Sequence, residues 1–111
     1  GIQSDGSFIH EFDALTGHLD QHREWWVSAE GMIGFLHAYQ HSRKEEYLDK
    51  VFRLWKFTKN HLIDHNQGEW KWGVLDDYTD MNNYKMGFWK CPYHNVRACL
   101  EVRRRIVELN C

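Results

Sequence analysis

The single proline of the chain, Pro92, constrains the fold most, because it marks the start of a helix. Proline fits the first helical turn, where its missing N–H is not needed, and apolar residues at helical spacing follow it. The pattern predicts a helix from Pro92 to about Leu109, with His94 at its start and Arg97 one turn later. The helix dipole favours a neutral imidazole there, so His94 is a candidate general base. The alternative is a histidine that caps the helix or packs in the core.

Two earlier stretches also have helical patterns. Apolar residues at three- and four-residue steps predict a helix that is capped near Asp20 and ends at about His41. Ser42, with Glu45 three residues later, resembles a capping box for a second helix that runs to about Leu62. Its apolar stripe lies opposite a charged face, which is typical of an outer, amphipathic helix.

The first of these helices contains two glycines, Gly31 and Gly34. Glycine weakens a helix but permits close approach of a neighbouring helix. Trp26 and Glu30 are four residues apart, so the two side chains lie on one face of this helix.

Short strands are expected outside the helices. Residues 8–12 alternate in polarity and predict a short strand or hairpin before the first helix. Trp70, Trp72 and Val74 alternate in the same way, and residues 84–89 are expected to return as the partner strand. The predicted fold class is therefore all-α, with three helices and two short β-hairpins.

Composition excludes several classes of protein. The net charge of -2 gives no electrostatic case for nucleic acid, and no apolar run is long enough to span a membrane. Three cysteines without metal-ligand spacing, including Cys111, predict reduced thiols and a cytoplasmic location. Aromatic residues make up 15% of the chain. Such a large apolar load should partly face outward, so we expect the isolated chain to self-associate.

Three stretches of the sequence resemble one known family. They are residues 25–40 (WWVSAEGMIGFLHAYQ), 61–72 (HLIDHNQGEWKW) and 89–97 (WKCPYHNVR). Together they resemble the C-terminal part of the N-acylglucosamine 2-epimerase superfamily, and within it the cellobiose (mannobiose) 2-epimerase branch. One position departs from the pattern, because Ser28 stands where the family usually has glutamine.

The resemblance implies a partial (α/α)6 toroid, a closed ring of six helical hairpins. From helix geometry the chain holds roughly a third of such a ring. Residues 1–111 are expected to form one C-terminal portion of this domain, with no internal boundary. A small natural relative that assembles its ring from several copies is the alternative.

The resemblance also implies a reaction. The family inverts C2 of a reducing sugar, here the reducing-end glucose or mannose of a β-1,4-disaccharide such as cellobiose. Two histidines exchange the C2 proton through an enediol intermediate, and no metal or nicotinamide cofactor is required. By resemblance His94 is one of them. No stretch of this chain matches the motif of the second histidine, so the 111-residue chain alone is expected to be inactive.

The resemblance further implies a set of substrate-binding residues. Trp89 and one of Trp25 or Trp26, with Trp26 preferred, are expected to stack on the sugar. Glu30 is expected to bind a hydroxyl or to position a catalytic group, and Arg97 to stabilise the enediolate. The alternatives are core packing for the tryptophans, a structural hydrogen bond for Glu30, and a simple ion pair for Arg97.

Other functions stay open at this point. Within the superfamily they are an N-acylglucosamine 2-epimerase and an aldose–ketose isomerase of monosaccharides. Outside it stands a catalytically inactive carbohydrate-binding fragment. A metal site is disfavoured, because the i, i+4 pairs His18/His22 and His37/His41 have no evident third ligand.

Overall fold

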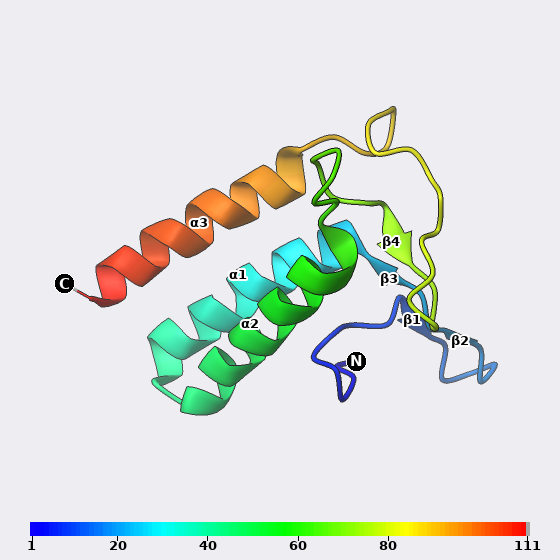
Figure 1. Ribbon diagram of the computed structural model, residues 1–111. Coiled ribbons are helices and arrows are strands. Elements are labelled where there is room, and N and C mark those ends of the chain that lie inside the picture. Colours follow the sequence, from blue (N-terminus) through cyan, green and yellow to red (C-terminus); the bar gives the residue numbers. More distant parts are fainter. Residues whose placement is uncertain (111) are drawn as a thin grey trace.

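Three helices and four very short strands make up the fold in a computed structural model that describes residues 1–110 (Figure 1). The helices are α1 (Trp25–Ser42), α2 (Glu45–Phe57), which continues into the π-helical turn η1 (Thr58–Leu62), and α3 (Tyr93–Leu109). The strands are β1 (Glu11–Phe12), β2 (Leu19–Asp20), β3 (Arg23–Glu24) and β4 (Gly73–Val74). The prediction of three helices is confirmed, and the predicted sulfhydryl state of Cys111 lies outside the described residues.

Helix α1 contacts both other long helices. Helix α2 returns antiparallel to α1, whereas α3 runs parallel to α1 on its other side (Figure 1). The side-chain contacts agree with this direction, because His94 near the start of α3 meets Glu30 in the first half of α1. Arg105 near the end of α3 meets Gln40 near the end of α1. Helices α1 and α3 therefore begin at the same end of the molecule.

The strands form two separate antiparallel pairs. Strand β1 pairs with β2 as a hairpin, as predicted for this region, with Glu11 opposite Asp20. The predicted second hairpin of residues 70–74 with 84–89 is wrong, because β4 pairs with β3 and places Val74 opposite Arg23. This pairing continues into α1, since the Trp25 N–H donates to the Trp72 carbonyl at 3.0 Å.

The start of α1 also differs from the prediction. The helix begins at Trp25 rather than near Asp20, with Glu24 in an extended conformation at the N-cap position. The reason is tertiary, because the backbone of residues 23–24 is held as a strand by β4. Ser42 is likewise not the cap of α2. It is the last residue of α1, where its Oγ donates to the Ala38 carbonyl at 2.7 Å, and α2 follows Lys44.

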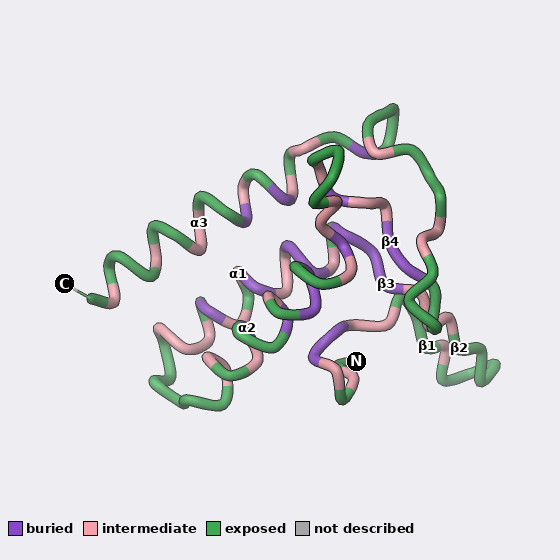
Figure 2. Tube along the Cα trace, in the orientation of Figure 1, coloured by how far each residue is buried: buried purple, intermediate pink, exposed green. Residues whose placement is uncertain are grey.

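Buried residues gather where α1 packs against α2 and along β3 and β4 (Figure 2). Gly31 permits this close contact, because a Cβ there would lie 2.9 Å from Leu54 Cδ2 and 2.6 Å from Phe8 Cε2. The expectation of close approach is therefore confirmed at Gly31. It is wrong at Gly34, where a Cβ would meet no atom within 4 Å.

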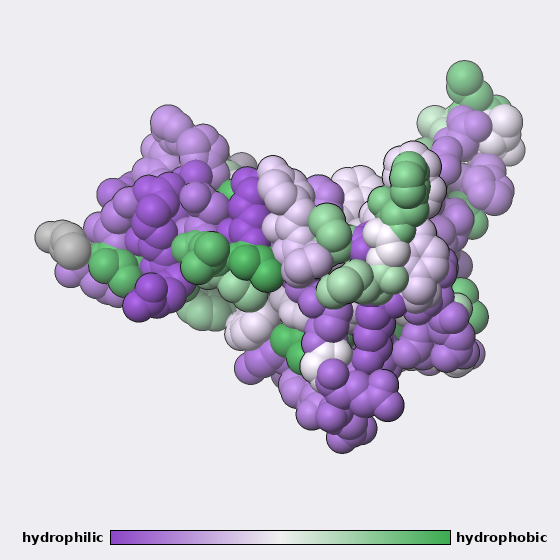
Figure 3. Space-filling view, turned by 90° about the horizontal axis from the view of Figure 1, so that it is seen from above, coloured by the Kyte–Doolittle hydropathy of each residue, from purple (hydrophilic) through white to green (hydrophobic). Residues whose placement is uncertain are grey.

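An apolar groove of about 450 Å³ runs between α2 and α3. Its lining includes Trp55 from α2 and Val102 and Ile106 from α3. Figure 3 shows apolar side chains in a row along the arm at the left, which is α3. The groove is the outward apolar surface that the aromatic-rich composition predicts. No helix of the described part is long and apolar enough to cross a membrane.

Candidate functional site

A polar cluster joins the first half of α1 to the start of α3. Proline at position 92 is the N-cap of α3, and the Val96 N–H donates to its carbonyl at 2.9 Å. His94 thus lies in the first turn, as predicted, and its Nδ1 is 2.9 Å from Glu30 Oε1. Arg97, one turn later, donates to the other oxygen of Glu30. One carboxylate therefore holds both polar side chains of α3.

This geometry decides which nitrogen of His94 is available. A carboxylate oxygen can only accept, so the hydrogen of the neutral ring lies on Nδ1. Nε2 then carries the lone pair, and no described residue makes a hydrogen bond to it. A histidine oriented in this way has the form that a general base requires, with an orienting carboxylate behind it.

The charged groups of the cluster stabilise one another electrostatically. Burial acts to raise the pKa of Glu30, but hydrogen bonds from His94 and Arg97 and the charge of Arg97 outweigh it, so this pKa is lowered. The hydrogen bond to Glu30 raises the pKa of Arg97. Arg97 therefore keeps a fixed positive charge beside His94.

Two tryptophans lie beside the His94 ring, but only one faces solvent. The Trp25 and Trp26 ring centroids are 6.4 Å and 6.2 Å from that of His94. Trp25 is 3% exposed and belongs to the core, whereas Trp26 is 39% exposed. Of the two, Trp26 is the ring that a sugar can reach.

Trp89 lies apart from this cluster. It is 76% exposed, and its one aromatic partner among the described residues is Phe88, in edge-to-face contact at 4.8 Å between centroids. The structure therefore brings together His94, Glu30, Arg97 and Trp26, and it leaves Trp89 on the exposed loop before α3.

Behind the start of α3 lies a buried ion pair that the sequence did not reveal. The Lys90 side chain is fully buried, and its Nζ is 3.2 Å from Glu69 Oε1 and 2.9 Å from the Lys85 carbonyl. Asn95 donates to the same Glu69 oxygen at 2.8 Å. Burial lowers the pKa of Lys90, against the opposing effect of Glu69. These contacts hold the start of α3 against the loop that precedes β4.

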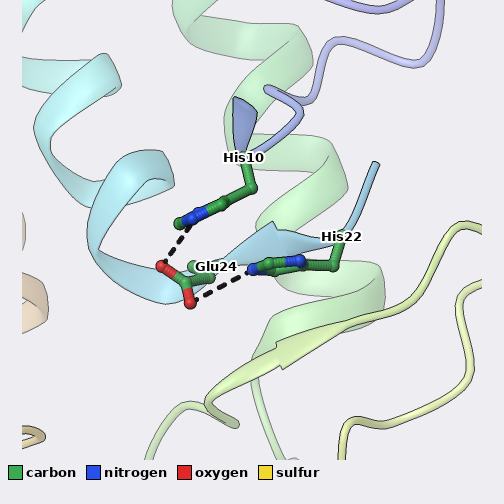
Figure 4. A group of neighbouring side chains, drawn as sticks. All are labelled: His10, His22 and Glu24. Carbon is green, nitrogen blue, oxygen red and sulfur yellow. Dashed lines mark hydrogen bonds and ion pairs between the residues drawn. The ribbon is translucent and has the colours of Figure 1, made fainter. Parts of the chain in front are cut away.

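A second group of titratable residues lies on the hairpin side of Trp26. His10, His22 and Glu24 place one ligand atom each within 4.8 Å of one another, and both imidazoles point toward the carboxylate (Figure 4). The two rings are stacked, with centroids 4.2 Å apart and planes 21° apart. Because an imidazole lone pair lies in the ring plane, two nearly parallel rings cannot both direct a lone pair at one ion between them. This arrangement does not suit a single metal ion.

Comparison with known proteins agrees with the fold. Residues 1–98 match the N-acylglucosamine 2-epimerase (GlcNAc 2-epimerase) family. A cellobiose 2-epimerase of Dictyoglomus turgidum is 46% identical over 102 residues, which is 91% of this chain and 26% of the relative. A D-mannose isomerase of Marinomonas mediterranea is 33% identical over 88 residues, or 78% of this chain and 22% of the relative.

Solved structures give the same result. The cellobiose 2-epimerase of Spirochaeta thermophila superimposes with a TM-score of 0.88 and 42% identity, over 96% of this chain and 27% of that protein. A D-mannose isomerase superimposes with a TM-score of 0.82 and 29% identity, over 92% of this chain and 26% of that protein. The chain thus spans about a quarter of the length of the relatives it matches.

The helices and strand pairs form a section of an (α/α)6 toroid, the fold of sugar epimerases and isomerases. The chain belongs to the N-acylglucosamine 2-epimerase family.

Proposed function

We propose that this chain supplies one acid/base histidine and one sugar-stacking surface to a sugar 2-epimerase. The substrate proposed is the reducing-end glucose or mannose of a β-1,4-disaccharide such as cellobiose. The observation that carries the proposal is the hydrogen bond between His94 Nδ1 and Glu30, which leaves Nε2 free beside the exposed ring of Trp26.

The reaction follows from these positions. A sugar in its open-chain form stacks on Trp26, and its C2 proton passes to Nε2 of His94. The electrons of the C2–H bond form the enediolate, and a proton returned to the opposite face of C2 gives the epimer. The acid that returns this proton comes from a second histidine outside this chain.

Arg97 and Trp89 complete the proposed site. The guanidinium of Arg97 is held by Glu30 beside His94, so its positive charge stabilises the negative charge that develops on the enediolate. Trp89 lies five residues before His94 on an exposed loop, and we propose that it covers the sugar from that loop.

Deuterium exchange at C2 of cellobiose tests this function. The 111-residue chain, incubated with cellobiose in deuterated water, is expected to give neither epimer nor exchange, because it holds one of the two histidines. A chimera in which this chain replaces the matching segment of the Dictyoglomus turgidum enzyme is expected to regain both. A folded chimera without exchange would overturn the proposal, and exchange by the chain alone would place a second base within it.

Isomerisation of a monosaccharide is the alternative function, and the similarity to D-mannose isomerases favours it. Both reactions begin with proton removal at C2 and share the enediol. They differ in the return of the proton, which goes to C2 in an epimerase and to C1 in an aldose–ketose isomerase. Incubating the chimera with cellobiose and with mannose separates them, because a ketose product identifies the isomerase. Incubation with N-acetylglucosamine in the same assay tests the alternative of an N-acylglucosamine 2-epimerase.

We also propose that the apolar groove makes the isolated chain self-associate. The lining residues Val102 and Ile106 come from α3, which buries little of its apolar surface. Sedimentation is expected to show dimers or larger species, and Val102→Asp is expected to reduce them. A wild-type monomer at high concentration would contradict this proposal. A cytoplasmic location is proposed from the free thiols of Cys91 and Cys99.

A further inference from the structure

Glu24 receives more hydrogen bonds than an ordinary residue at a helix start. It is the last residue before α1, and its side chain is 10% exposed. The indole Nε1–H of Trp26 donates to its Oε2 at 2.5 Å, and that of Trp72 donates to its Oε1 at 3.1 Å. One nearly buried carboxylate therefore holds two indole rings, and one of them is the exposed ring beside His94.

The two stacked histidines also lie beside the carboxylate of Glu24. His10 Nδ1 is 3.5 Å from Oε2, and His22 Nε2 is 3.3 Å from Oε1. On its other side His22 is anchored by Asp20, at 2.5 Å from Nδ1. Figure 4 shows both rings turned toward Glu24 from separate segments of the chain. Each oxygen thus accepts from one indole and has one imidazole nitrogen beside it.

A carboxylate suits this place because of its acceptor capacity. It offers two oxygens with about four lone-pair sites, whereas a glutamine amide offers one accepting oxygen and replaces the other with donors. Because the two indoles donate to different oxygens of Glu24, an amide in the same position accepts from only one of them and turns its NH₂ group toward the other. The identity of residue 24 therefore decides whether both rings stay in place.

We propose that Glu24 is a positioning residue, which fixes the tilt of Trp26 through its indole N–H and so sets the plane on which the sugar stacks. This inference rests on the proposed epimerase function. The Trp26 and His94 ring centroids are 6.2 Å apart, so the tilt of the indole sets how firmly a sugar is bound against it beside His94. Because Trp26 is 39% exposed, core packing alone does not hold it, and the bond to Glu24 supplies the restraint.

The first measurement reads the indole N–H groups directly, without any sugar. In ¹⁵N–¹H spectra of the chain, Glu24→Gln is expected to move the Nε1–H resonances of Trp26 and Trp72 and to leave that of Trp55 in place. Glu11→Gln, which removes an exposed carboxylate of β1, is the matched control and is expected to move none of them. Unchanged Trp26 and Trp72 resonances in the Glu24 variant would overturn the proposal, whatever the reaction proves to be.

The second measurement uses activity of the full-length product of the reading frame that encodes this chain. Glu24→Gln is expected to raise KM about tenfold with kcat within about threefold, since a hydrogen bond to a charged group that serves sugar binding is lost. Trp26→Phe keeps an aromatic ring without the N–H and is expected to raise KM similarly. The double variant should have a KM no higher than that of either single variant, because the two substitutions remove the same interaction. Additive losses, or a fall in kcat at constant KM, would contradict a role through Trp26.

Zinc ions provide the remaining test, since two imidazoles and a carboxylate are also zinc ligands. The melting temperature of the chain is expected to be the same with Zn²⁺ and with a chelator. A rise with Zn²⁺ that Glu24→Gln abolishes would assign the carboxylate to an ion and overturn the positioning role. If the full-length product has no epimerase activity while the indole resonances move as expected, the proposed function fails and the contact between Glu24 and Trp26 stands.

Discussion

Helix α1 is packed on two sides, and the two contacts differ in chemistry. Toward α2 the contact is apolar and close, since Gly31 lets Leu54 approach the helix backbone. Toward α3 the contact is polar at its two ends, with Glu30 bound to His94 at one end and Gln40 bound to Arg105 at the other. The first contact stabilises the fold through buried apolar area, and the second orients the groups that we propose to act on the sugar.

The difference follows from what each helix can bury. In α2 the apolar stripe faces α1, and Leu54 is fully buried. In α3 only Asn95 and Ala98 are buried, and residues such as Leu100 remain 62% exposed. Hydrogen bonds to the charged Glu30 side chain therefore determine how the start of α3 packs against α1. Substitutions on the α3 side should change activity, whereas those on the α2 side should change stability.

The largest effect is expected from His94→Ala. A lost general base lowers the rate by about a hundred- to ten-thousand-fold. The full-length product should lose C2 deuterium exchange to this extent while it keeps its melting temperature and sugar affinity. His18→Ala, on the exposed hairpin, is the control and should keep full exchange. Near wild-type exchange in His94→Ala, or a loss explained by unfolding, would show that His94 is structural.

Glu30→Gln should have the next largest effect, because it keeps the size of the side chain and removes the charge that orients His94 and Arg97. Hydrogen bonds to charged groups contribute about 1.5–3 kcal/mol, so kcat should fall roughly ten- to a hundredfold. Exchange kinetics at saturating sugar measure this change. Glu46→Gln on the exposed face of α2 serves as the control. A rise in KM alone would instead assign Glu30 to binding of a sugar hydroxyl.

Two glycines of α1 test the contact between α1 and α2. Gly31→Ala places a methyl group against Leu54 and Phe8 and should destabilise the chain by roughly 1–3 kcal/mol. Gly34→Ala meets open space and should stabilise it by about 0.5–1 kcal/mol, because alanine favours a helix. Urea unfolding of both variants gives the comparison. Stabilisation by both substitutions would mean that the α1–α2 contact is looser than the structure shows.

The smallest effect is expected from lowering the pH. Hydrogen bonds from His94 and Arg97 lower the folded-state pKa of Glu30 below the usual glutamate value, so the stability it contributes is present above that usual value. The contribution is lost as pH falls through the lowered folded-state pKa. The unfolding free energies of wild type and Glu30→Gln should therefore differ near neutral pH and converge once the pH lies below the lowered pKa of Glu30. A constant difference across this range would mean that the contacts with His94 and Arg97 do not depend on the charge of Glu30.

Part of the site was predictable from local spacing. Pro92 at the helix start and the three-residue step from His94 to Arg97 place both side chains on one face of α3. The four-residue step from Trp26 to Glu30 does the same on α1. Such relations depend only on helix geometry, so they hold before any tertiary contact is known.

The sequence by itself determined the three helices and the start of the last one at Pro92, because these depend on neighbours within a few turns. Only the tertiary structure decided that β4 pairs with β3, that Glu30 binds His94, and that Glu24 binds the indole of Trp72. These partners are separated by 48 to 64 residues or belong to strands of two residues each. No local propensity specifies such contacts. They form when packing of α1 against α2 and α3 brings the segments together, and the burial of each polar group then requires a partner.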